Sequence, residues 1–272
     1  MTAIARALSR ATQTLSASSD TPRLDAELLM AHALDIERDT LLLKRQEGPV
    51  PSAYTGFVDR RSAGEPVAYI TGKRAFWNIE LEVGPGALVP RPDSETLIAA
   101  AVEHFAGTPG PKRILDLGTG PGTLLLAALD QWPRSTGIGV DSSDEALGYA
   151  RRNAKRLGLG ERAFFKRGDW AKGISETFDL LLINPPYVAE GEDLGPGVAE
   201  YEPAEALFAG EEGLAEYRRL APEIARLLAP GGLAAVEIGH EQEQAVEALL
   251  REQGLKPRLA RDLAGRPRAM LI

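Results

Sequence analysis

Cysteine is absent from this 272-residue sequence, so disulfides, thiolate zinc sites and thiol nucleophiles are excluded. The absence is compatible with a reducing cytosol, and we expect a cytoplasmic protein. The sequence contains three histidines, and their positions, His32, His104 and His240, show no metal-ligand spacing. No metal site is therefore predicted.

Long apolar runs are also missing. No stretch is long and apolar enough to span a bilayer, and the first twenty residues lack the basic start and apolar run of a signal peptide. A basic excess is missing too, because 31 lysines and arginines stand against 39 acidic residues, a net charge of −8. Non-specific nucleic-acid binders usually carry a basic face, so direct binding of nucleic acid is not expected.

The chain is predicted to be helical up to about residue 72. Leu24, Leu28 and Ala31 recur at helical spacing and predict a core-facing stripe. Residues 76–89 alternate in polarity around a Gly-Pro-Gly sequence, which indicates a hairpin or an extended linker. We therefore predict three consecutive parts, namely a helical domain over residues 1–73, a hairpin linker over 74–92 and an α/β domain over 93–272.

Strand and helix patterns alternate from residue 112 onward. Strands are predicted at 114–117, 137–140, 163–166, 179–183, 233–238, 257–261 and 268–272. Helices are predicted at 94–105, 123–131, 145–157, 212–228 and 241–253. This alternation predicts a mostly parallel, seven-stranded sheet with helices on both faces.

A glycine-rich loop joins the first of these strands to its helix and consists of Gly118, Thr119, Gly120, Pro121 and Gly122. Its glycines allow a tight turn and close approach of a ligand to the main chain, and N–H groups at a helix start bind carboxylates or phosphates. The glycine spacing differs from the dinucleotide-binding fingerprint. A loop that serves only as a tight turn is the alternative.

Two later strand ends extend this predicted site. Asp141 ends the second strand, where a carboxylate accepts hydrogen bonds from two ribose hydroxyls. Trp170 follows the third strand, where an adenine would lie, although an ordinary core role for this side chain stays open. No second glycine set and no hydride-transfer partner is evident. The predicted ligand is an adenosyl compound that carries a carboxylate and an amine, and S-adenosyl-L-methionine is such a compound.

The most informative motif follows the strand at 179–183 and consists of Asn184, Pro185, Pro186 and Tyr187. Neither proline has an N–H group, so the strand ends abruptly at the sheet edge where ligands bind. The carbonyls of Asn184 and Pro185 can accept both hydrogens of a planar NH2 group, and the Tyr187 ring can stack on the same plane. Together with the glycine loop, this motif predicts methyl transfer to a planar nitrogen. A turn that only ends the strand is the alternative.

The ordered set of motifs resembles the release factor glutamine methyltransferase family of class I S-adenosyl-L-methionine-dependent methyltransferases, over almost the whole chain. The segments that carry the resemblance are 23–29, 64–72, 88–96, 116–122, 184–187, 201–203, 237–242 and 262–268. Asp93 and Ser94 stand where the family usually has Glu and Thr, and Pro121 stands where a small polar residue is common.

The resemblance implies a Rossmann-like fold with a small N-terminal helical domain that recognises the substrate. It implies methylation of the glutamine side-chain amide in the Gly-Gly-Gln motif of class I peptide-chain release factors. The 118–122 loop, Asp141, Trp170 and Asn184 would hold the cofactor, and residues 184–187 would be catalytic.

Two other functions stay open. An adenine-N6 methyltransferase of DNA or RNA uses the same four-residue motif, but it needs basic residues for the flanking phosphates. A non-catalytic adenosyl-binding module would keep the fold, but it has no need of Asn184 and Tyr187. Neither the preferred release factor nor the oligomeric state follows from the sequence.

Overall fold

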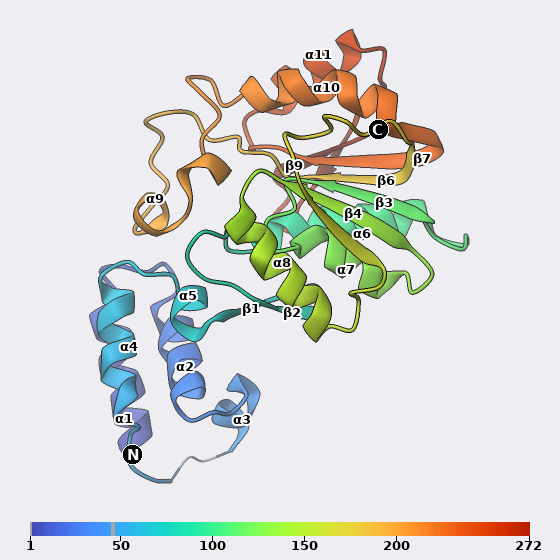
Figure 1. Cartoon of the computed structure of the whole chain (residues 1–272). Coiled ribbons are helices and arrows are strands. Elements are labelled where there is room, and N and C mark those ends of the chain that lie inside the picture. Colours follow the sequence, from blue (N-terminus) through green and yellow to red (C-terminus); the bar gives the residue numbers. More distant parts are fainter. Residues whose placement is uncertain (1, 45–46) are drawn as a thin grey trace. The chain divides into compact units, whose positions relative to one another are not determined.

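The computed structural model describes residues 2–44 and 47–272. The chain forms two compact units (Figure 1). The first contains the described residues up to Lys73 together with the segment Asp193–Glu202, and the second contains Arg74–Glu192 and Pro203–Ile272. The helical unit therefore takes in a segment that follows Asn184 closely in the sequence.

The first unit confirms the predicted helical region. Its helices are α1 (Ala3–Leu15), α2 (Pro22–Ala33), α3 (Arg38–Leu43), α4 (Ala53–Ser62) and α5 (Val67–Thr71). The predicted stripe on α2 is wrong at Leu24, which is 38% exposed, whereas Leu29 and Met30 are fully buried. The buried face of α2 therefore differs from the predicted one, and it includes Asp25 and Glu27. Arginine side chains pair with both of these carboxylates.

The segment Asp193–Glu202 packs on the helical unit through a close backbone contact. Gly197 has a φ of +81°, and a Cβ there would lie 2.0 Å from the Gly64 carbonyl oxygen. Only glycine tolerates both conditions. The short helix α9 (Val198–Tyr201) follows, and the Tyr201 hydroxyl donates to the Ala63 carbonyl at 3.5 Å.

The second unit is built on a seven-stranded sheet with the order β5-β4-β3-β6-β7-β9-β8, which confirms the predicted fold class. Its strands are β3 (Arg113–Leu117), β4 (Thr136–Asp141), β5 (Ala163–Arg167), β6 (Phe178–Ile183), β7 (Leu228–Glu237), β8 (Arg258–Arg261) and β9 (Pro267–Leu271). Strands β3 to β7 pair in parallel, and β9 is antiparallel to β7 and β8. The strand order reverses between β3 and β6, and ligands bind at such a switch point.

Helices cover both faces of this sheet (Figure 1). One face carries α10 (Ala215–Leu227) and α11 (Glu243–Glu252), and the other carries α6 (Glu95–His104), α7 (Thr123–Gln131) and α8 (Asp144–Arg156). The central strand β6 is buried on both sides, which explains its uninterrupted apolar sequence. None of the helices in residues 2–44 and 47–272 has the length and apolar character needed to cross a membrane.

A two-stranded sheet, β1 (Lys73–Phe76) with β2 (Ile79–Glu82), precedes the larger one. The buried side chain of Asn153 on α8 ties it to the glycine loop. Its Nδ2 donates to the carbonyls of Glu82 and Pro121, both at 3.0 Å, and its Oδ1 accepts from the Glu82 N–H at 2.7 Å. One asparagine thus fixes two segments to each other.

Replacement of Asn153 by alanine is expected to lower the free energy of unfolding by about 2–3 kcal/mol, because three hydrogen bonds are lost around a fully buried position. Urea denaturation measures the change. Arg152→Ala is the matched control, since it removes an exposed ion pair with Glu82 worth less than about 1 kcal/mol. Equal effects of the two substitutions would contradict this account of Asn153.

Candidate active site

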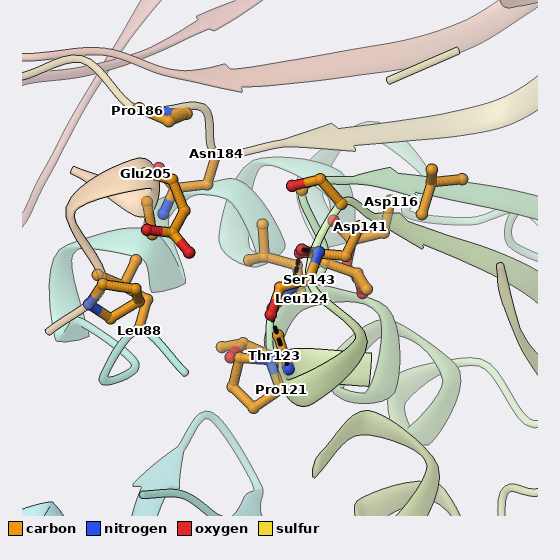
Figure 2. A pocket seen from close by; sticks show the side chains of 18 of the residues that line it. Leu88, Asp116, Pro121, Thr123, Leu124, Asp141, Ser143, Asn184, Pro186 and Glu205 are labelled. Carbon is orange, nitrogen blue, oxygen red and sulfur yellow. Dashed lines mark hydrogen bonds between the residues drawn. The ribbon is translucent and has the colours of Figure 1, made fainter. Parts of the chain in front are cut away.

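A cavity of about 330 Å³ lies at the carboxyl ends of the central strands (Figure 2). Eight of the residues predicted from the sequence line it, namely Gly118, Thr119, Gly120, Pro121, Asp141, Trp170, Asn184 and Pro186. Gly122, Pro185 and Tyr187, which were also predicted, are not among its lining residues. Asn184 and Glu205 lie on one side of the cavity, and Asp141 and Ser143 lie on the other (Figure 2).

The glycine loop passes close to the aromatic wall of the cavity. Gly118 has a φ of +74°, and a Cβ there would lie 3.1 Å from the Trp170 ring. Gly122 has a φ of +88°, and a Cβ there would lie 2.7 Å from Leu126. Both positions require glycine for conformation and for space. The Trp170 indole N–H donates to Glu216 Oε2 at 2.5 Å, which fixes the ring beside the loop.

Asp141 holds the loop in place from the end of β4. Its Oδ2 accepts from the Gly120 N–H at 2.7 Å, and its Oδ1 accepts from the Ser143 N–H at 2.9 Å. Burial raises the pKa of Asp141, backbone N–H donors oppose that rise, and the nearby Glu205 carboxylate adds to it. Each carboxylate oxygen keeps capacity for a further hydrogen bond from a ligand hydroxyl.

Asp116, at the end of β3, is buried with one oxygen unpartnered. Its Oδ2 accepts from the Thr119 hydroxyl at 2.6 Å and from the Leu125 N–H at 3.1 Å. Its Oδ1 has no hydrogen-bond partner among the described residues. Asp116 therefore caps the loop and the start of α7 through one oxygen only. Burial raises the pKa of Asp116 to about 7, and the neighbouring Asp141 raises it further against the hydrogen bonds to Oδ2.

These groups fit S-adenosyl-L-methionine. A protonated amine would satisfy the free Asp116 oxygen, which belongs to a residue that lines the cavity. Asp141 is placed to accept from hydroxyl groups, and the Trp170 ring offers a surface for an aromatic base. The buried Asp116 and the half-buried Asp141 carboxylates also favour a ligand with a positive charge.

The affinity for S-adenosyl-L-methionine is expected to weaken as the pH falls below about 7. Asp116 is protonated below its raised pKa, and a cationic amine binds the ionised form more tightly. The dissociation constant should therefore rise by up to about tenfold per pH unit below that pKa. Calorimetry between pH 5.5 and about 8.5 measures it. Asp116→Asn should bind with little pH dependence, and a dependence as steep as that of the unsubstituted enzyme would contradict the assignment.

Asn184 presents its amide to the cavity in a defined direction. It follows β6 directly, and its Nδ2 donates to the Ser94 hydroxyl oxygen at 3.3 Å. The donor end of the amide is thus engaged with the protein, and the Oδ1 end is left for a ligand. Tyr187 is directed elsewhere, because its hydroxyl donates to Glu237 Oε1 at 3.2 Å. Burial raises the pKa of the Tyr187 hydroxyl, so it remains a donor.

Sequence reasoning missed several residues at or near this site. Glu205, Glu216 and Arg219 line the cavity, and none of the three belongs to a motif predicted from the sequence. Ser94 lines the cavity and was noticed only as a departure from the family pattern. In residues 2–44 and 47–272 no group of three or more potential metal ligands occurs.

Comparisons with known proteins show which family the chain is similar to. Residues 6–72 match the family model of the PrmC N-terminal domain, and residues 110–259 match that of a methyltransferase domain. The release factor glutamine methyltransferase of Caulobacter vibrioides is 42% identical over 94% of this chain and 90% of its own length. That of Vibrio cholerae is 39% identical over 98% of this chain and 96% of its own length.

Solved structures share the fold at lower identity. A methyltransferase from Pyrococcus furiosus aligns with a TM-score of 0.52 and 19% identity, covering 70% of this chain and 86% of that one. The hMettl16 catalytic domain, solved with a MAT2A 3'UTR hairpin, aligns with a TM-score of 0.55 and 17% identity. The alignment covers 72% of this chain and 75% of that one. These likenesses concern the fold alone.

The fold, the cavity and the matched models define a class I methyltransferase that uses S-adenosyl-L-methionine as its methyl donor. Within that class, the chain belongs to the release factor glutamine methyltransferase family, because relatives of that name share about two fifths of its residues over nearly its whole length.

Proposed function

We propose that this enzyme methylates the side-chain amide nitrogen of the glutamine in the Gly-Gly-Gln motif of class I peptide-chain release factors. The observation that supports it best is the direction of the Asn184 amide, whose Nδ2 donates to Ser94 while Oδ1 remains for a substrate N–H. An acceptor of this kind at the sheet edge suits a carboxamide NH2 group. Membership of the family supports the same substrate.

The cofactor is proposed to lie along the glycine loop, with the residues Gly118, Thr119, Gly120, Pro121, Gly122, Asp141, Trp170 and Asn184 around it. S-adenosyl-L-methionine supplies an electrophilic methyl group on a sulfonium. Pro121 removes one N–H donor from the loop, but it precedes the N-cap Gly122 of α7, so no hydrogen bond of the helix is lost.

Asn184, Pro185, Pro186 and Tyr187 are proposed to form the catalytic motif. A carboxamide nitrogen is a weak nucleophile because its lone pair is delocalised into the carbonyl. Asn184 Oδ1 and the Pro185 carbonyl would accept both of its N–H bonds and so direct the lone pair toward the methyl group. These hydrogen bonds strengthen as positive charge develops on the nitrogen, so they favour the transition state over the ground state. After transfer, the acidic N–H proton passes to solvent.

The helical domain, residues 1–73, is proposed to recognise the release factor, with residues 74–92 as a hairpin linker and 93–272 as the methyltransferase domain. A glutamine side chain alone offers too little surface for a specific protein complex. We place the reaction in the cytoplasm, where translation occurs, and propose no direct contact with nucleic acid because the net charge is −8.

A labelled methyl group separates this proposal from methylation of adenine. S-adenosyl-L-methionine with a radioactive methyl group is incubated with the enzyme and a release factor, with DNA, with RNA, or with no acceptor. Label is expected in the release factor alone. Label in nucleic acid and none in the release factor would establish the adenine alternative instead.

A further inference from the structure

The orientation of the Asn184 amide depends on a buried hydroxyl. Ser94 is 2% exposed, and its oxygen accepts from Asn184 Nδ2 at 3.3 Å. An asparagine amide has nearly the same shape after a half turn about its last bond, which exchanges its acceptor and donor ends. A Ser94 hydroxyl that pointed its hydrogen at Asn184 would favour the exchanged orientation. The direction of this hydroxyl therefore decides which end of the amide faces the substrate.

Glu237 lies behind Ser94, at the end of β7, and is 1% exposed. Its Oε1 accepts from the Tyr187 hydroxyl, and its Oε2 accepts no well-formed hydrogen bond from the described residues. Burial raises the pKa of Glu237 to about 7, and the groups that oppose this rise are Ser94 first, then Arg268 and Tyr187. Asp93 is the neighbouring charge that raises it further.

The surroundings of Glu237 are also ordered by hydrogen bonds and ion pairs. Arg268, 7% exposed, pairs with Asp93 at 3.1 Å and with Asp262 at 3.3 Å. The Tyr217 hydroxyl donates to the Glu237 backbone carbonyl at 2.9 Å. The Glu237 backbone is thus held by Tyr217 of α10 and by its pairing with Ala269 of β9. Neither Glu237 nor Tyr187 lines the cavity.

A carboxylate can only accept hydrogen bonds. The buried Oε2 of an ionised Glu237 has room for one more donor, and a Ser94 hydroxyl that donates to it would turn its lone pairs toward the Asn184 NH2 group. The Tyr187 hydroxyl likewise donates to Glu237, which fixes its ring. A single acceptor therefore sets the direction of both side chains of the motif.

We infer that Glu237 is a positioning residue, which directs Asn184 Oδ1 into the cavity through Ser94 and holds the Tyr187 ring through its hydroxyl. The inference rests on the proposed function, since it assigns Asn184 Oδ1 to the substrate amide. Glu237 does not touch the substrate; it acts through the two residues that it orients.

Two substitutions test this relay, in which Glu237 acts through Ser94 on Asn184. The full-length enzyme is used, with a release factor as substrate. Ser94→Ala removes the hydroxyl and is expected to lower kcat about 10-fold. Glu237→Gln replaces an acceptor-only group with one that also donates, which favours the exchanged orientation of Asn184, and is expected to lower kcat about 100-fold. The dissociation constant for S-adenosyl-L-methionine should stay within about 2-fold in both variants.

Three controls distinguish positioning from a loss of stability. Ser94→Thr keeps the hydroxyl and should retain kcat. Ser135→Ala removes another buried hydroxyl, which donates to the Pro111 carbonyl before β4, and should leave kcat unchanged. In the Ser94→Ala background, Glu237→Gln should lower kcat by less than about 10-fold, because the relay is already broken.

The inference is overturned if Glu237→Gln or Ser94→Ala retains its kcat, or if Ser94→Thr loses as much as Ser94→Ala. A parallel loss of cofactor affinity would also overturn it. If Glu237→Gln does not fold, the two Ser94 variants decide alone. An unsubstituted enzyme that binds the cofactor but does not methylate any release factor would instead contradict the proposed function.

Discussion

Replacement of Asn184 by alanine is expected to lower kcat about 10²- to 10³-fold, the usual effect of removing one preorganised polar contact to a transition state. The variant loses the acceptor that orients the substrate nitrogen. Cofactor affinity should fall much less, by under about 10-fold, because the glycine loop and Asp141 remain. Single-turnover kinetics with a release factor measures the first quantity, and calorimetry measures the second.

Asn78→Ala is the matched control for this prediction, since Asn78 is an exposed residue in the turn between β1 and β2. Its kcat should equal that of the unsubstituted enzyme. If Asn184→Ala kept kcat within about 3-fold of that value, orientation by Asn184 would contribute too little to be the basis of catalysis.

Removal of residues 1–73 is expected to separate recognition of the protein substrate from the chemistry. We expect kcat/KM for a full-length release factor to fall about 100-fold, because most of the area buried in the complex would be lost. For a short peptide that contains Gly-Gly-Gln, kcat/KM should stay within about 3-fold, because the cavity is built from the second unit alone.

Cofactor affinity is the control for this truncation, since an intact methyltransferase domain binds S-adenosyl-L-methionine as the full chain does. The segment Asp193–Glu202 loses its packing partner in the truncated chain, but it contributes no residue to the cavity lining. Unchanged efficiency on the full-length release factor would refute the recognition role of the helical domain.

The helices and strands of the second unit were predictable because the sequence patterns that indicate them lie within or next to each element. The helix predicted at 123–131 is α7 (Thr123–Gln131), with its glycine loop before it, and the apolar strand that precedes Asn184 is β6. Glycine spacing, proline pairs and apolar runs determine the backbone conformation within a few residues of their own positions. The short helix α9 was not predicted, and α10 begins at Ala215 rather than near 212, because contacts with remote segments decide both.

The supporting residues of the site were not predictable for the same physical reason. Trp170 and Glu216 meet across 46 positions of sequence, and Asn153 reaches Glu82 across 71. Glu237 ends β7 and begins the 237–242 segment of the family resemblance, but no role followed from its position in the sequence. Hydrogen-bond partners at such separations follow from the fold and leave no periodic pattern in the sequence.

Mass spectrometry of a purified release factor, after incubation with this enzyme and S-adenosyl-L-methionine, tests the central claim most directly. The account predicts one added methyl group, on the glutamine of the Gly-Gly-Gln motif, and none with the Asn184→Ala variant at equal enzyme concentration and time. An unmodified glutamine, with cofactor binding demonstrated in the same preparation, would contradict the account.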